Sequence, residues 1–206
     1  MKKGKGAKGP KAVSEVAVKG TAAAEARKDI EKAQELVRGA TLGWAKFNTA
    51  DSPGQNIALE FGHVNPRPLN HSAVNNLVKD FLVSGRDPVK NYIYVLVRKE
   101  WLEPGSYATD GALPWPQLPE LKFTDQAYGV TVYILSGNHR TGASILLRDQ
   151  LRKDKAKAEA ELAKITGDSK EDAATREEYI KLIALLDAQI AECVKWGVIL
   201  IDAGAQ

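Results

Sequence analysis

The sequence has little of what marks secreted or membrane proteins. Cys193 is the only cysteine, so no internal disulfide can form, which suits a reducing compartment. The longest apolar runs, such as residues 92–97 and 130–135, are far shorter than the roughly 20 residues that a membrane span needs. No apolar stretch typical of a secretory signal follows the first lysines. We therefore expect an intracellular protein, either cytoplasmic or nuclear.

Familiar catalytic signatures are also missing. The chain contains no Walker A loop and no recognisable Ser-His-Asp arrangement. His63 and His71 do not stand at metal-binding spacing from each other or from the cysteine, so we expect no dedicated metal site. These absences exclude the commonest nucleotide hydrolases and serine hydrolases by motif.

Strong charge of one sign is confined to the N-terminus. The formal net charge is only +3, yet residues 1–20 hold six lysines against a single acid, Glu15. A segment of mainly Gly, Lys, Ala and Pro cannot bury enough apolar surface to fold, so we expect residues 1–20 to be a disordered basic tail. The tail either keeps the protein soluble or makes a weak contact with nucleic acid or another acidic partner.

The rest of the chain, residues 21–206, has the pattern of one α+β domain. Apolar residues at helical spacing predict helices, and alternating or continuous apolar runs predict strands. The predicted helices cover 21–38 (ending at Gly39), a segment between a cap at Asn70 or Ser72 and a stop at Gly85, 144–165 and 172–194. The predicted strands cover 56–61, 91–98, 128–135 and 196–202. Residues 44–51 show no decisive pattern.

Two segments look like insertions. Prolines and glycines in residues 104–126 predict a long surface excursion, in which Trp115 either stacks on a base or packs on its prolines as a lid. Residues 144–195 predict a helical hairpin whose two apolar stripes bury each other. A coiled-coil arm that binds a partner or a second copy is the alternative, so an oligomer formed through this hairpin is open.

One motif carries chemistry. A strand of strong β pattern leads directly into a turn and a long helix, through the residues Ser136, Gly137, Asn138, His139, Arg140, Thr141, Gly142 and Ala143. A glycine there lets the backbone turn sharply, and the helix start offers N–H groups and a positive dipole to an anion. His139 and Arg140 add donors suited to phosphate. As an alternative, His139 is a buried structural histidine and Arg140 pairs with Asp149 or with an acid near the C-terminus.

The motif and its context resemble the ParB/sulfiredoxin superfamily. Residues 133–143 are similar to its Gly-x-His/Arg-Arg-x-x-Ala stretch, and residues 64–69, with the helix after them, resemble its Arg-Pro segment and first helix. The last predicted strand stands where the family has the strand that follows its motif helix. The resemblance covers roughly residues 56–98 and 128–202. It implies a small mixed sheet with helices, to which this chain adds the hairpin and an N-terminal helix.

By matching position, the resemblance implies a phosphate site. Its nucleotide-binding residues would be Gly137, Asn138, His139, Arg140, Thr141, Arg67 and Asn76. Some relatives are nucleotide-dependent kinases that use an upstream acid, for which Glu60 and Asp80 are the candidates. The implied ligand is a nucleoside triphosphate, ATP or CTP, carried in with Mg²⁺.

The chain also departs from the family. Sulfiredoxins have a nucleophilic cysteine where this chain has Asn138, and they use a lysine near the start of the first helix where this chain has Ala73. ParB proteins usually carry two arginines in the loop and a DNA-binding helix-turn-helix, which is not seen here. We therefore expect a nucleotide-binding protein that hydrolyses its nucleotide slowly or uses it as a switch. The alternatives are a non-catalytic nucleic-acid or protein interaction module, and a small-substrate phosphotransferase or nuclease; whether the chain is an enzyme is left open.

Overall fold

The computed structural model describes residues 27–28, 31–51, 54, 56–61, 68–167 and 169–205. The chain divides into two compact units, Met1–Ala40 and Thr41–Gln206. In the first unit, residues 31–40 are helical and the helix continues past Gly39. The predicted stop at Gly39 is therefore wrong, because this glycine does not take the positive φ that ends many helices. The predicted tail of residues 1–20 lies outside the described residues.

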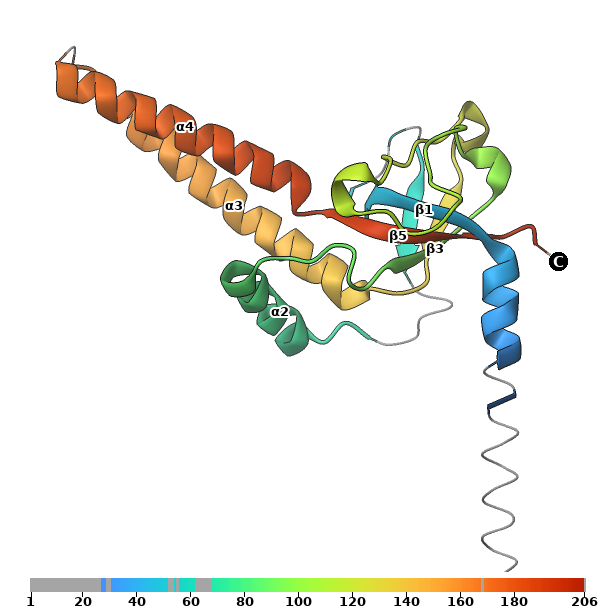
Figure 1. The fold of residues 1–206 in the computed structure, drawn as a ribbon. Coiled ribbons are helices and arrows are strands. Elements are labelled where there is room, and N and C mark those ends of the chain that lie inside the picture. The colour runs from blue at the N-terminus through green and yellow to red at the C-terminus, as the bar shows by residue number, and fades with distance from the viewer. Residues whose placement is uncertain are drawn as a thin grey trace, which may run out of the picture. The chain divides into compact units, whose positions relative to one another are not determined.

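The second unit is an α+β domain built on a five-stranded mixed sheet. Three of its strands, β1, β5 and β3, are labelled in Figure 1. The strand order is β1-β5-β3-β4-β2. β1 and β5 are antiparallel, β5 and β3 parallel, β3 and β4 antiparallel, and β4 and β2 parallel. The strands are β1 (Thr41–Asn48), β2 (Ala58–Phe61), β3 (Ile93–Val97), β4 (Thr131–Ile134) and β5 (Lys195–Asp202). The α+β class and the four predicted strands are confirmed.

The strand β1 has no counterpart among the predicted strands. Its side chains alternate, with Gly43, Ala45 and Phe47 buried and the residues between them half-buried. Two of those three buried positions are occupied by glycine and alanine, which contribute little to a hydrophobic pattern. β1 pairs with β5 from Thr41↔Ile201 to Asn48↔Lys195. This pairing between distant segments makes residues 41–48 a strand, and the local sequence could not reveal it.

The segment predicted as a surface excursion contributes to the core. Leu118 and Phe123 are buried, and the rings of Phe123 and Phe47 lie 6.0 Å apart. The segment also pairs with the outer edge of β1: Trp44 N donates to Ala108 O at 2.9 Å. It therefore protects an edge strand that would otherwise be open to another chain. The prediction of a purely surface segment is wrong, because its few apolar residues are placed to reach the sheet.

Three helices belong to the same unit. The helix α2 (His71–Ser84) begins at the predicted cap Asn70, whose side chain accepts from Ala73 N at 3.1 Å, and ends at Gly85 with φ 75°. The helices α3 (Asn138–Lys164) and α4 (Lys170–Glu192) run side by side as the predicted hairpin (Figure 1). α3 begins at Asn138, so the motif is part of the helix rather than a loop before it. No helix among the described residues is long and apolar enough to cross a membrane.

Candidate functional site

The turn between β4 and α3 requires a glycine. Gly137 is the N-cap of α3 and has φ 86° and ψ 12°, in the left-handed region. A Cβ there would lie 2.7 Å from Ile93 Cγ1 in the core. Both the backbone conformation and the close approach of β3 therefore exclude a side chain. The preceding Ser136 Oγ accepts from Tyr94 N at 3.0 Å, which fixes the turn against β3.

The first turn of α3 is electropositive. Gly137, as the N-cap residue, has no side chain with which to cap the helix, and the first turn contains no acidic residue. The first backbone hydrogen bond of the helix runs from Thr141 N to Gly137 O at 2.9 Å. The N–H groups before Thr141 belong to the turn in which an α-helix supplies no partners of its own. Such a helix start attracts anions through its N–H groups and dipole.

His139 joins the starts of two helices. Its Nε2 accepts a hydrogen bond from Asn70 N at 3.0 Å. The ring is therefore neutral in this arrangement and carries its proton on Nδ1. Since Asn70 also caps α2 through its side chain, the same residue connects the cap of α2 with the first turn of α3. The Nδ1–H group is the donor that this geometry leaves for another contact.

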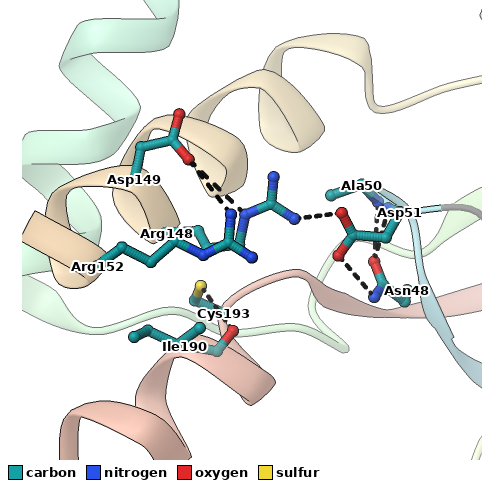
Figure 2. Close-up of polar contacts among 8 residues, drawn as sticks. All are labelled: Asn48, Ala50, Asp51, Arg148, Asp149, Arg152, Ile190 and Cys193. Carbon is teal, nitrogen blue, oxygen red and sulfur yellow. Dashed lines mark hydrogen bonds and ion pairs between the residues drawn. The ribbon is translucent and has the colours of Figure 1, made fainter. Parts of the chain in front are cut away.

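Arg140 is held by an aromatic ring and a backbone carbonyl. Its guanidinium carbon lies 5.7 Å from the centre of the Trp196 ring, and Nη1 donates to Asn91 O. Burial lowers the pKa of Arg140, although a guanidinium stays charged at any ordinary pH. Among the described residues no carboxylate pairs with it. The alternative pairing with Asp149 is not found, since this carboxylate lies near Arg148 and Arg152 instead (Figure 2).

Trp196 is the centre of this arrangement, and sequence reasoning did not assign it a role. Its Nε1 donates to Ser144 Oγ at 3.1 Å, and the Phe81 ring lies 5.9 Å away. A second guanidinium, that of Arg86, lies 4.7 Å from the ring centre. Arg86 also donates to the carbonyl oxygens of Glu192 and Cys193 at the end of α4, and burial lowers its pKa. One aromatic residue thus anchors two arginines from different parts of the chain.

Two further motif residues serve the interior. Thr141 is buried, and its Oγ1 lies 3.1 Å from the Oγ1 of Thr49. Gly142 allows the start of α2 to approach, because a Cβ there would lie 3.3 Å from Leu69 Cδ1 and 3.5 Å from Val74 Cγ2. The absence of a side chain at Gly142 therefore lets Leu69 and Val74 pack closely against the first turns of α3.

The predicted acidic residues do not gather at the motif. Asp80 is exposed on α2, ten residues after the cap at Asn70, or about 15 Å of helix. Asn76 is also exposed on α2. Glu60 lies in β2 and is paired with Tyr133 of β4. Because β2 and β4 are parallel, their C-terminal ends lie on the same side of the sheet, and Glu60 is close to that end. Arg67 lies outside the described residues.

A second polar cluster surrounds the buried Arg148 of α3, as Figure 2 shows. Arg148 Nη1 donates to Asp51 Oδ1 at 2.5 Å, and Asn48 Nδ2 donates to Asp51 Oδ2 at 3.2 Å. Burial raises the pKa of Asp51, but the hydrogen bonds from Arg148 and Asn48 outweigh it, so the pKa is lowered. Arg148 Nε has no hydrogen-bond partner among the described residues. The cluster connects the turn after β1 to α3.

Cys193 lies beside this cluster but is a poor nucleophile. Its Sγ donates to Ile190 O at 3.4 Å, and burial raises the pKa of the thiol despite the nearby arginines. The residue borders a cavity of about 320 Å³ between α2, α3 and α4. Another cavity, of about 340 Å³, lies between residues 103–106 and 119–122. Residues 137–141 line neither of these cavities.

Neither metal-binding groups nor known relatives identify the function of this site. No group of three or more histidine, cysteine, aspartate or glutamate residues in the described ranges is arranged to hold a metal ion. Comparisons with protein-family models, with curated proteins and with solved structures gave no match.

Proposed function

We propose that the chain binds a nucleoside triphosphate, ATP or CTP, at the start of α3, in a domain of the ParB/sulfiredoxin-like fold. The observation that carries the proposal is the first turn of α3, which begins at a left-handed glycine without a capping side chain or an acid and holds Arg140 without a carboxylate partner among the described residues. Such a turn favours an anion with several acceptor oxygens.

In this proposal the backbone of the first turn, Arg140 and His139 each contact the phosphates. The backbone N–H groups of His139 and Arg140 would bind a phosphate oxygen, and the Arg140 guanidinium would donate to a second oxygen from a position held by Trp196. His139 would donate through Nδ1–H, because its Nε2 already accepts from Asn70 N. Mg²⁺ would arrive with the phosphates, held mainly by phosphate oxygens and water, since the described residues supply no cage of carboxylates.

Calorimetric titration tests the proposal. The full chain is titrated with ATP, CTP and GTP in the presence of Mg²⁺, and the nucleotide that binds is then compared with its diphosphate and its nucleoside. Because the proposed contacts are to phosphates, affinity should fall from triphosphate to diphosphate and vanish for the nucleoside. Equal affinity for the nucleoside would place recognition on the base and contradict the phosphate site. Absence of heat with all three triphosphates, supported by equilibrium dialysis, would reject nucleotide binding.

Slow hydrolysis is the first of the two uses proposed for the nucleotide. Glu60 is the better placed acid. It lies near the C-terminal end of β2, beside the end of β4 that leads into the motif, whereas Asp80 is about 15 Å along α2 from its cap. If Glu60 is the general base, Glu60→Gln should reduce turnover by about 100-fold or more and leave nucleotide affinity unchanged. Asp80→Asn is the matched control and should retain turnover. A loss in Asp80→Asn with none in Glu60→Gln would reverse the assignment.

The other use is a conformational switch, and one contact favours it. His139 Nε2 connects the first turn of α3 to the cap of α2, so phosphate bound at that turn would act directly on the position of α2.

An interaction module without nucleotide affinity is the second candidate function. It is favoured by the contacts that Arg140 already makes with Asn91 and Trp196. Salt-sensitive binding to DNA, lost on deletion of residues 1–20, would support this second candidate.

A further inference from the structure

The helix α4 carries two parallel stripes, and α3 covers only one of them. The first stripe has residues at alternating spacings of four and three, all buried or half-buried: Asp172, Arg176, Tyr179, Ile183, Leu186, Ile190 and Cys193. The second stripe is the same series moved back by one residue, so it lies on the adjacent face of the helix. Its members are Glu171, Thr175, Glu178, Leu182, Leu185, Gln189 and Glu192, and all of them are exposed.

The second stripe leads into a cavity. Gln189 and Glu192 border the 320 Å³ cavity, together with Leu147 and Leu151 of α3 and the end of α2 at Phe81 and Leu82. Leu182 and Leu185 lie one to two turns before Gln189 on the same face of α4 and are 42% and 55% exposed. The exposed leucine pair therefore lies on one continuous surface with a hollow whose lining is mainly apolar but includes Arg86 and Glu192. Helices with two adjacent stripes of this spacing are typical of bundles of more than two helices.

We propose that this surface binds a second copy of the same chain, with the two α4 helices antiparallel about a two-fold axis. A two-fold axis near residues 186 and 187 places residues whose numbers sum to about 373 opposite each other. Leu182 and Leu185 of each copy then lie over residues 188–191 of the other, at the mouth of its cavity. Each hollow receives the leucine pair of the partner, so both apolar features are buried at once.

The charges along the stripe favour this register. In the antiparallel arrangement Lys181 of one copy faces Glu192 of the other, and both residues lie within α4. Within its own chain Lys181 pairs with Glu177 at 2.6 Å, and Glu192 pairs with Lys195 at 2.9 Å. These pairs can therefore extend across the interface as a network of alternating sign. A parallel arrangement would set identical residues against each other, with Lys181 against Lys181 and Glu178 against Glu178.

Sedimentation equilibrium of the full chain tests the association, and two glutamate variants locate it. The wild type should approach a mass of twice 22.4 kDa as its concentration rises. Leu182→Glu should raise the dimer dissociation constant at least about tenfold, since it buries a charge in the partner's hollow. Ile180→Glu is the matched control, because Ile180 is 53% exposed but lies on nearly the opposite side of α4. It should leave the dissociation constant unchanged.

A charge exchange tests the register without changing Leu182 or Leu185. Lys181→Glu and Glu192→Lys should each weaken the dimer, because each places like charges opposite each other, and the double variant should restore it. Circular dichroism of every variant verifies folding. A monomeric wild type across the concentration range would overturn the proposal, and so would equal losses in Leu182→Glu and Ile180→Glu. Single charge variants that weaken a dimer without rescue in the double variant would overturn the antiparallel register.

Discussion

At the scale of single residues, the motif depends on a glycine with two separate reasons to be one. Gly137 has φ 86°, and a Cβ would meet the side chain of Ile93 at 2.7 Å. Gly105 offers a comparison, since its φ of 79° is similar but nothing lies within 4 Å of the position that a Cβ would take there. The two glycines therefore share the backbone cost of a substitution and differ in the packing cost.

Replacement of these glycines separates the two costs. Gly105→Ala should lower the free energy of unfolding by about 1 kcal/mol, from backbone strain alone. Gly137→Ala should lower it by about 2–4 kcal/mol, because strain and a clash with the core add. Urea unfolding followed by circular dichroism measures both values. Equal losses in the two variants would show that Ile93 yields to the added methyl group.

The partners of Arg140 illustrate what sequence cannot supply at this scale. The glycine, the helix start and the two charged residues of the motif follow from a strong strand pattern that runs into a helix. The carbonyl of Asn91 is 49 positions away in sequence, and Trp196 is on a strand at the far end of the chain. Only the pairing of β3 with β4 and β5 brings both to the motif. No local periodicity records such a contact.

At the scale of elements, the ion pair between Asp51 and Arg148 joins the turn after β1 to α3. The pKa of the Asp51 carboxyl is lowered in the folded state, so the pair stabilises the fold above the unfolded pKa of about 3.9. This contribution disappears as the pH falls through the folded pKa. Because Arg148 is buried, loss of the carboxylate leaves a buried charge with one partner fewer.

Asp51→Asn should therefore destabilise the protein in a pH-dependent way. At pH 7 we expect a loss of about 1–2 kcal/mol, between the values for exposed and buried ion pairs, since Asp51 is half exposed. The difference from wild type should shrink below about pH 4 and vanish once Asp51 is protonated. Asp149→Asn, which removes only the long contacts with Arg148 at 3.9 Å and Arg152 at 4.0 Å, serves as the control. A loss in Asp51→Asn that does not change with pH would contradict the electrostatic explanation.

The sequence predicts the elements where the apolar pattern is strong. The cap of α2 at Asn70, the hairpin of α3 and α4 and the strand β5 all follow from periodicity and capping residues. The sequence does not predict β1, because Gly43 and Ala45 occupy inward positions and contribute nothing distinctive to a hydrophobic pattern. For residues 104–126 the prediction fails because prolines dominate the local signal, whereas Phe123 and Leu118 reach the core through tertiary packing.

At the scale of the whole molecule, the two proposals concern different parts of the second unit. Nucleotide binding is assigned to the first turn of α3, and self-association is assigned to the exposed stripe of α4. The two functions should therefore separate by mutation: Leu182→Glu should weaken the dimer and keep nucleotide affinity. The net charge of the whole molecule gives little support to either proposal, because the value of +3 derives from the lysines of residues 1–20.

The most direct test of the central claim compares two arginines that each lie over a tryptophan ring. Arg140 lies 5.7 Å from the centre of the Trp196 ring at the motif, and Arg98 lies 5.8 Å from that of Trp101 after the opposite end of β3. In calorimetric titrations with the tightest-binding triphosphate and Mg²⁺, Arg140→Ala should weaken binding by about 10- to 100-fold. Arg98→Ala should bind like the wild type. Unchanged affinity in Arg140→Ala, or an equal loss in both variants, would contradict a phosphate site at the start of α3.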